Sequence, residues 1–308
     1  MTLHAPSIGV AVITHNSKHH LLNCLPPLLQ SPLKPRVLVV NSSSADGTVE
    51  MAKQLGAEVL VIPRHEFNHG TTRELARRYL QTDIIGMLTP DAYFVDEMAF
   101  GKLIDPLLKN KAEVAYARQI PHTGADFFEA FAREFNYPNQ SHLRSLKDIS
   151  QYGVYTFFCS NSCAAYSSKA LDIIGGFSPV LLGEDTVAVA KLLRNGCSIA
   201  YVADALVKHS HRYSLIQEFR RNFDIGLARK QYGELLQAPK GDTQRGLDYL
   251  QTMFKRLLED APFKIPYGFA HIVVKWLGYR LGKSSSQTPL WFKKLISSQD
   301  FYWSSKNN

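Results

Sequence analysis

The sequence lacks the cysteine spacing of a zinc site or a disulfide framework. Its four cysteines are Cys24, Cys159, Cys163 and Cys197, and none belongs to a CxxC pair. Cys159 and Cys163 have no second pair nearby that would complete a tetrahedral zinc site. We therefore expect reduced thiols, which are typical of the cytosol.

Long hydrophobic runs are missing as well. The most apolar stretch, residues 267–279, falls short of the roughly 20 residues of a membrane span and contains His271 and Lys275. The N-terminal sequence "MTLHAPSIGVAVITHN" has no basic segment followed by a long apolar core, so it predicts a first strand and not a secretory signal. We expect a cytoplasmic protein, with the inner face of the membrane as a further location.

Acidic residues are fewer than basic ones. The 308 residues include 27 Asp and Glu against 35 Lys and Arg, a net charge of +8, which favours anionic partners such as nucleotide phosphates, nucleic acid or acidic lipid. The basic residues are dispersed, and finger spacing and aromatic RNA-binding motifs are missing, which argues against nucleic acid. With 45% hydrophobic residues, the chain can bury the core of one large or two modest domains.

Short β-branched runs alternate with helical segments over the first two thirds of the chain. We expect strands at 8–14, 36–42 and 58–63, with helices near 19–30 and 47–55 between them. Strands joined by helices in this way predict a parallel sheet with crossover connections.

The alternation continues to about residue 211. The expected helices are 71–81 and 183–196, and the expected strands are 83–88, 113–121, 157–167 and 198–211. The connection between 121 and 157 is long enough to be functional, for example as a lid. From Tyr213 the chain is helical in character, so we expect an α/β domain at 1–212 and a helical C-terminal extension at 213–308.

Polar motifs stand where the expected strands end or the helices begin. They are "NSSSADGT", "FNHGTTRELAR", "TPDA", "GEDT" and "KHSH". Open α/β sheets bind ligands beyond the carboxyl ends of their strands, so the shared placement predicts a site. Each motif alone is weak, because Asp91 after Pro90 also suits a turn and an acidic pair also suits a helix N-terminus.

In order and spacing, these motifs resemble those of the family 2 inverting glycosyltransferases with the GT-A fold, and among them bacterial rhamnosyltransferases. The resemblance spans residues 8–221 and also includes "VITHN", "LTPDAYF" and "GGFSPVLLGEDTVAVAKLLRNG". It implies a Rossmann-like, mostly parallel sheet flanked by helices. It further implies that a nucleotide-diphosphate sugar binds across the carboxyl edge of this sheet, with a divalent metal bridging the diphosphate.

The resemblance also implies the residues that bind the donor. They are Thr14, Asn16, Asn41, Ser43, Asp46, Arg73 and Asp91. The loop residues Asn41, Ser43 and Asp46 would hold base and ribose, and Arg73 would face the diphosphate as a permanent cation. Taken alone, Arg73 is also consistent with a solvated helix residue.

Asp91 resembles the last acidic residue of the family's Asp-X-Asp metal motif. The triplet here is Thr89-Pro90-Asp91, so the first carboxylate is absent. Mg²⁺ or Mn²⁺ prefers oxygen ligands and accepts a histidine nitrogen, which His209 or His211 would supply. The two histidines lie two residues apart and face the same side of a strand, so their spacing does not choose between them.

The "GED" motif resembles the family's catalytic acidic pair. It implies that Asp185 is the general base that deprotonates an acceptor hydroxyl for direct attack on the anomeric carbon, with Glu184 as the neighbouring candidate. The resemblance implies transfer of a rhamnose-like deoxyhexose, with dTDP-rhamnose as the favoured donor, to a polysaccharide or lipid-linked acceptor. Arg212, Arg220 and Arg221 would stabilise the leaving diphosphate, form a solvated helix face or contact acidic lipid.

Two other functions stay open. A sugar nucleotidyltransferase would want a Gly-rich phosphate loop near the N-terminus, but "ITHNSKHH" has no glycine. A non-enzymatic binder of acidic membrane or nucleic acid would suit the positive charge. The tail, with Trp276, Trp291, Trp303 and several lysines, suits either peripheral docking on a membrane or a core helix with a solvated basic face.

Overall fold

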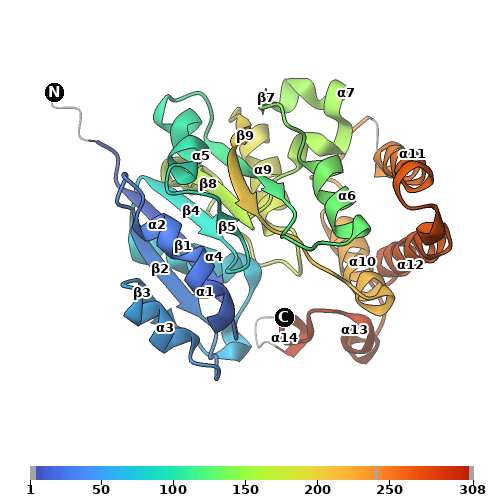
Figure 1. Cartoon of the computed structure of the whole chain (residues 1–308), viewed down its shortest axis with the longest axis horizontal. Coiled ribbons are helices and arrows are strands. Elements are labelled where there is room, and N and C mark those ends of the chain that lie inside the picture. Colours follow the sequence, from blue (N-terminus) through green and yellow to red (C-terminus); the bar gives the residue numbers. More distant parts are fainter. Residues whose placement is uncertain (1–4, 240–241, 305–308) are drawn as a thin grey trace.

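A computed structural model describes residues 5–239 and 242–304 (Figure 1). Its centre is a nine-stranded sheet with the order β3-β2-β1-β4-β8-β6-β9-β5, and β7 also pairs with β9. The strands are β1 (Ile8–Thr14), β2 (Arg36–Asn41), β3 (Glu58–Val61), β4 (Ile84–Leu88), β5 (Tyr93–Phe94), β6 (Val114–Ile120), β7 (His142–Arg144), β8 (Cys163–Ser167) and β9 (Ile199–Lys208).

The sheet is mostly parallel, as predicted. Strand β1 pairs in parallel with β2 and β4, β2 with β3, and β6 with β9. Strand β8 runs antiparallel between β4 and β6, so β6 and β9 keep the direction of β4. The short strands β5 and β7 pair antiparallel with β9. The carboxyl ends of β1, β2, β4, β6 and β9 therefore share one edge of the sheet.

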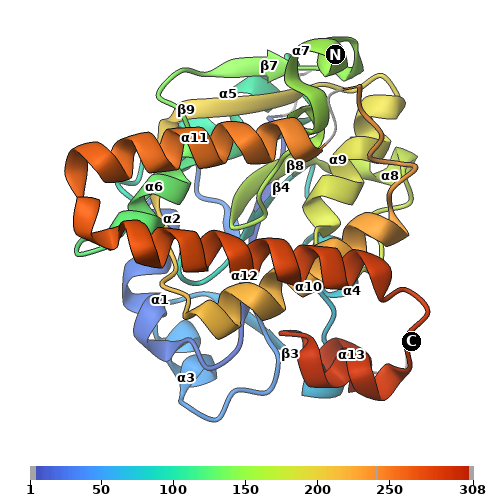
Figure 2. The same ribbon diagram turned by 90° about the vertical axis from the view of Figure 1, so that its right-hand side faces the viewer.

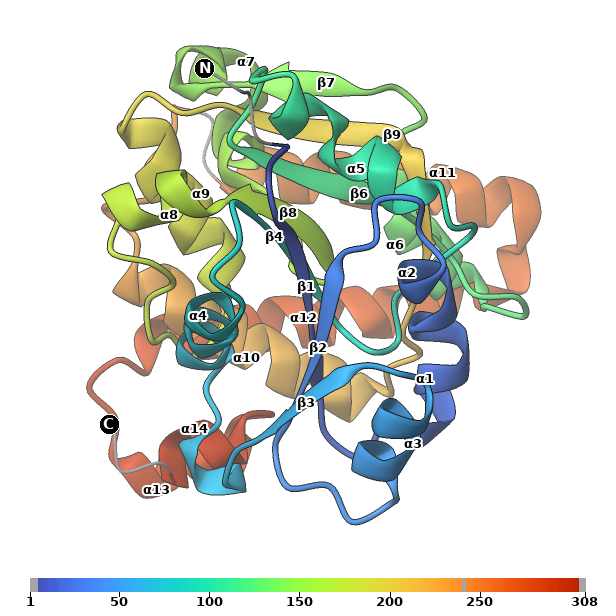
Figure 3. The ribbon, with the colours of Figure 1, turned by 90° about the vertical axis from the view of Figure 1, so that its left-hand side faces the viewer.

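Helices cover both faces of the sheet (Figure 3). One face carries α1 (Lys18–Cys24), α2 (Pro26–Leu29), α3 (Thr48–Gln54) and α5 (Ala99–Leu108), and the other carries α4 (His69–Leu80), α8 (Ser168–Ile173) and α9 (Glu184–Arg194). Along β1, Val10 and Val12 enter one core while Ala11 and Ile13 enter the other. A strand buried on both faces needs the continuous apolar run that the sequence shows.

Three predicted elements differ in extent. The helix expected at 19–30 is divided into α1 and α2, because Pro26 lacks an N–H group and begins the second helix. The strand expected at 157–167 is only Cys163–Ser167, because a 3₁₀ helix, η3 (Gly153–Phe157), and a polar turn precede it. The strand expected at 198–211 ends at Lys208, which places both histidines of "KHSH" in the loop beyond it.

The long connection before β8 is ordered. It contains α6 (Phe127–Asn136), β7, the 3₁₀ helix η2 (Leu146–Asp148), α7 (Ile149–Tyr152) and η3. Asp126 and Glu129 form a capping box at the start of α6. The fully buried guanidinium of Arg144 donates to the Tyr116 hydroxyl, 2.9 Å away, and to the Phe158 carbonyl, 2.7 Å away. These contacts anchor the connection to β6.

The C-terminal region is helical, as predicted. It contains α10 (Leu215–Gln231), α11 (Asp242–Asp260), the 3₁₀ helix η4 (Pro262–Lys264), α12 (Ile265–Ser284), α13 (Leu290–Ile296) and α14 (Asp300–Ser304). Helices α11 and α12 lie across one face of the molecule (Figure 2). The α14 residue Phe301 returns to the α/β region, where its ring centroid lies 5.0 Å from that of Phe67. Among the described helices, none combines the length and the apolarity needed to cross a membrane.

Candidate active site

A cavity of about 860 Å³ lies at the carboxyl ends of β1, β4 and β9 and extends between α6 and the C-terminal helices. Eight of the residues predicted to form the site line it: Thr14, Asn16, Arg73, Asp91, Glu184, Asp185, His209 and His211. Three others, Asn41, Ser43 and Asp46, are not among its lining residues. The structure thus brings together side chains separated by nearly two hundred residues of sequence.

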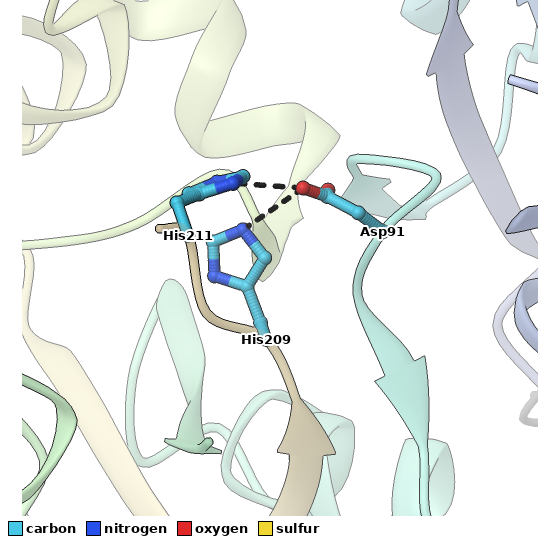
Figure 4. Close-up of side chains that lie close together, drawn as sticks. All are labelled: Asp91, His209 and His211. Carbon is cyan, nitrogen blue, oxygen red and sulfur yellow. Dashed lines mark ion pairs between the residues drawn. The ribbon is translucent and has the colours of Figure 1, made fainter. Parts of the chain in front are cut away.

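Asp91, His209 and His211 converge on one point of this cavity (Figure 4). Asp91 follows β4, and both histidines follow β9. The Asp91 Oδ2 atom lies 3.5 Å from His209 Nε2 and 3.3 Å from His211 Nε2. One ligand atom from each residue lies within 4.8 Å of the others, so the structure brings both candidate histidines to the carboxylate.

A hydrogen-bond chain orients His209. The side-chain amide of Gln119, in β6, donates from its Nε2 to Ser160 Oγ. This bond turns the Gln119 Oε1 toward His209 Nδ1, which lies 2.8 Å away. Arg133 donates to the same oxygen, so Nδ1 must carry the proton and Nε2 a lone pair. This His209 Nε2 is buried and has no hydrogen-bond partner among the described residues, although Asp91 Oδ2 lies opposite.

The donor set fits a divalent metal ion. Burial lowers the pKa of His209 and lowers that of His211 to about 3, so both imidazoles are neutral near pH 7. A lone pair on His209 Nε2 facing a carboxylate oxygen is unfavourable without a cation between them. Mg²⁺ and Mn²⁺ accept such ligands.

Glu184 and Asp185 stand in the first turn of α9, but their surroundings differ. Glu184 is 5% exposed, and its Oε1 lies 3.2 Å from Arg73 Nη1 and accepts a 3.0 Å hydrogen bond from Asn161 Nδ2. Burial raises the pKa of Glu184, but the charge of Arg73 outweighs burial and lowers it. Glu184 is therefore ionised and held in place.

Asp185 is only partly buried and faces the cavity beside this ion pair. It accepts hydrogen bonds from the backbone N–H groups of Asn161, at 3.0 Å, and Thr186, at 2.6 Å. Burial and the neighbouring charge of Glu184 raise the pKa of Asp185 to about 6. A carboxylate with a raised pKa in a cleft is suited to accept a proton near neutral pH.

The predicted base- and ribose-binding residues stabilise the loops around β1 and β2. Asn41 is fully buried, and its Oδ1 accepts a 2.9 Å hydrogen bond from the Ser44 N–H group. Ser43 donates to a backbone carbonyl 2.9 Å away, and Asp46 accepts from two backbone N–H groups at 3.0 and 3.1 Å. Asn16, in the loop after β1, lines the cavity, whereas these three residues do not. Direct contacts of Asn41, Ser43 and Asp46 with a donor stay predictions.

Three residues that surround the site were missing from the sequence-based prediction: Gln119, Arg133 and Asn161. Gln119 stands near the carboxyl end of a strand, so the rule that selects Asp91 would also select Gln119. Arg133 lies in a helix of the long connection, where no motif marks it. Asn161 lies inside the stretch predicted to be a strand, which concealed its loop position.

Comparison with known proteins decides the family. Residues 9–175 match the family model described as glycosyl transferase family 2. The chain belongs to this family. The matched region contains four of the predicted residues that line the cavity, Thr14, Asn16, Arg73 and Asp91, whereas Glu184, Asp185, His209 and His211 follow it. The protein is therefore a glycosyltransferase.

Curated relatives extend the similarity beyond the family model. An O-antigen chain rhamnosyltransferase of Salmonella typhimurium, RfbN, is 34% identical over 96% of this chain and 96% of its own. The O-antigen chain rhamnosyltransferase WbaN of Salmonella anatum is 34% identical over 87% of this chain and 86% of its own. The similarity to RfbN therefore includes most of the C-terminal helices as well as the sheet.

Solved structures share the fold at low sequence identity. The mannosyltransferase PcManGT of Pyrobaculum calidifontis, in complex with GDP-Man and Mn²⁺, has a TM-score of 0.58 at 14% identity and covers 98% of this chain and 86% of its own. TarS 1–349 of S. aureus, in complex with UDP-GlcNAc, has a TM-score of 0.56 at 14% identity, with coverage of 96% and 89%. These likenesses confirm the predicted GT-A fold.

Proposed function

We propose that the protein is a metal-dependent, inverting rhamnosyltransferase. It moves the sugar from a nucleotide-diphosphate donor, with dTDP-rhamnose favoured, to a hydroxyl of a growing O-antigen-type polysaccharide or lipid-linked acceptor. The names of the two curated relatives support the sugar and the polymer. The observation that carries the reaction type is that the Asp91–His209–His211 cluster and Asp185 line one cavity.

Asp91, His209 and His211 would hold Mg²⁺ or Mn²⁺ in this proposal. When bound, the ion supplies positive charge to the diphosphate that departs with the electrons of the broken glycosyl bond. Gln119 keeps His209 in the tautomer whose Nε2 can ligate, as its 2.8 Å hydrogen bond requires. The guanidinium groups of Arg212 and Arg221 also line the cavity and add fixed positive charge.

Asp185 is the proposed general base. With a pKa of about 6, it is mainly ionised at neutral pH yet basic enough to take the proton of an acceptor hydroxyl. The acceptor oxygen then attacks the anomeric carbon opposite the departing diphosphate, so one new glycosidic bond forms as one bond breaks and the configuration inverts. Glu184, paired with Arg73, keeps the first turn of α9 and hence Asp185 in position.

The two parts of the chain have different proposed roles. Residues 1–212 would bind the donor, with Thr14 and Asn16 as cavity contacts on β1 and the following loop. Residues 213–308 would form the acceptor side, because α10, α11 and α12 contribute to the cavity wall opposite the sheet. A lipid-linked acceptor would also bring this extension close to a membrane surface.

The test is a transfer assay with dTDP-rhamnose, Mn²⁺ and a short O-antigen oligosaccharide acceptor, followed by NMR of the new linkage. The proposal expects the anomeric configuration opposite to that of the donor. A retained configuration would contradict direct displacement with Asp185 as the base. Formation of a nucleotide sugar from a nucleoside triphosphate and a sugar phosphate, without transfer, would instead indicate a nucleotidyltransferase.

A further inference from the structure

Helix α12 has one face directed at the body of the protein. Tyr267, His271 and Lys275 line the catalytic cavity, and their spacing of four residues places them on one side of the helix. Farther along this side, Gly278 and Gly282 press against α10. A Cβ atom added to Gly282 would lie 1.9 Å from a backbone carbonyl oxygen of α10, so the two helices are in close backbone contact.

The opposite face of α12 is apolar but exposed. Phe269, Val273, Trp276 and Leu277 are between 45% and 59% exposed, and Arg280 continues their row. We call these five residues the α12 outer face. Figure 2 shows α12 lying across the front of the molecule, where none of the other described elements covers it. A contiguous apolar helix face of this kind normally marks a binding surface.

Basic residues outnumber acidic ones in the chain segment that forms α12 and α13. Residues 261–299 contain six Lys and Arg residues and neither Asp nor Glu. The guanidinium of Arg280 lies 5.9 Å from the ring centre of Trp276, and Lys283 is exposed one turn farther on. At the other end of α12, Phe263 is 78% exposed and has the Lys264 ammonium 5.9 Å from its ring.

Helix α13 repeats this composition. Its residues Leu290, Trp291, Lys294 and Leu295 are exposed, and their spacing places them on one side of the helix. The other side, with Phe292 and Ile296, packs into a small core beneath α10. Two consecutive helices therefore present exposed aliphatic and aromatic side chains accompanied by cations.

We propose that the α12 outer face docks on the surface of an anionic phospholipid bilayer. Aromatic rings flanked by Lys and Arg suit the boundary between headgroups and acyl chains, where the rings leave water and the cations meet lipid phosphate. The charge favours anionic lipid over a second copy of this chain, because a contact between two copies would bring their Lys and Arg side chains together. A sheet of anionic headgroups complements the excess of Lys and Arg over Asp and Glu in residues 261–299.

The docking would give α12 a direct part in acceptor delivery, and this step rests on the proposed function. The cavity-lining residues Tyr267, His271 and Lys275 would stand one helix diameter from the bilayer surface. A glycan attached to a membrane lipid would then enter the cavity around α12 without leaving the membrane.

The test is co-sedimentation of the full chain with vesicles of phosphatidylcholine, alone or mixed equally with phosphatidylglycerol. We expect binding to the mixed vesicles that weakens steeply as salt is raised. The triple variant Phe269→Ser/Val273→Ser/Trp276→Ser should bind about tenfold more weakly or worse. The variant Arg280→Glu/Lys283→Glu should bind about 25-fold more weakly or worse, because each cation near an anionic surface contributes about fivefold.

The matched control changes three exposed apolar residues outside the C-terminal helices: Leu22→Ser/Met98→Ser/Ile173→Ser. It should bind vesicles as the wild type does, and equal loss in both triple variants would overturn the proposal. Wild-type protein that binds no vesicle, or that forms a dimer through Phe269, Val273 and Trp276, would overturn it as well. Binding of dTDP-rhamnose with Mn²⁺ is measured in parallel, so that failure of the proposed function is recognised separately.

Discussion

The guanidinium of Arg73 lies 3.2 Å from the carboxylate of Glu184, and both side chains are almost completely buried. Because Arg73 pairs with Glu184 and not with Asp185, the two adjacent carboxylates have different properties. Glu184 is held ionised and fixed, whereas burial and the charge of Glu184 raise the pKa of Asp185 to about 6. A pair of titratable groups with diverging pKa values is the arrangement expected where one of them moves a proton.

Replacing Asp185 by Asn should separate binding from catalysis. The amide keeps the shape of the side chain but cannot accept the acceptor's proton, so kcat should fall by about 10²–10⁴-fold while donor affinity stays within a few-fold. Single-turnover transfer and calorimetric donor binding measure the two effects. Asp204→Asn, at an exposed position of β9, is the control and should leave both unchanged. Normal transfer by the Asp185→Asn variant would show that Asp185 is not the general base.

The rate should depend on pH through the same carboxylate. Since the raised pKa of Asp185 lies at about 6, the base is ionised above that pH and protonated below it. We therefore expect kcat/KM to fall as the pH is lowered through about 6, roughly tenfold for each further pH unit. A pH–rate profile at constant ionic strength tests this. A profile that is flat through pH 6 would show that the proton goes elsewhere.

Gln119 should act on the metal through His209. Gln119→Leu removes the acceptor for His209 Nδ1–H and should weaken Mn²⁺ binding by about 10–100-fold. Gln119→Glu keeps an acceptor oxygen beside Arg133 and should retain most of the affinity. Titration of Mn²⁺ followed by electron paramagnetic resonance measures this without any turnover. Equal affinity in the Leu variant and the wild type would mean that Gln119 does not position a ligand.

Much of this site follows from the sequence because of a simple topological rule. Polar residues that follow parallel strands meet at one edge of the sheet, so Asp91 and the two histidines could be placed near one another before any coordinates. The resemblance of "GED" to the catalytic acidic pair of family 2 glycosyltransferases marked Glu184 and Asp185, because an acidic pair alone also suits an ordinary helix N-terminus. The helical character of the C-terminal region was equally visible in its composition and spacing.

Other features depend on packing that local patterns do not encode. Arg133 reaches the site because α6 folds back beside β6, and nothing in its neighbourhood in the sequence marks that approach. Asn41 lies in a polar loop motif, yet the structure buries it completely in a hydrogen-bond network. The pairing of Arg73 with Glu184 joins helices more than a hundred residues apart, so a solvated Arg73 could not be excluded from its sequence alone.

One experiment tests whether Asp91, His209 and His211 hold the metal ion that the donor needs. Calorimetric binding of dTDP-rhamnose is measured for the wild type and for Asp91→Ala, each with Mn²⁺ and then with excess EDTA. We predict that the wild type binds only with Mn²⁺ and that Asp91→Ala does not bind measurably in either condition. Equal donor binding in EDTA, or unchanged Mn²⁺-dependent binding by Asp91→Ala, would contradict a donor site built on Asp91, His209 and His211.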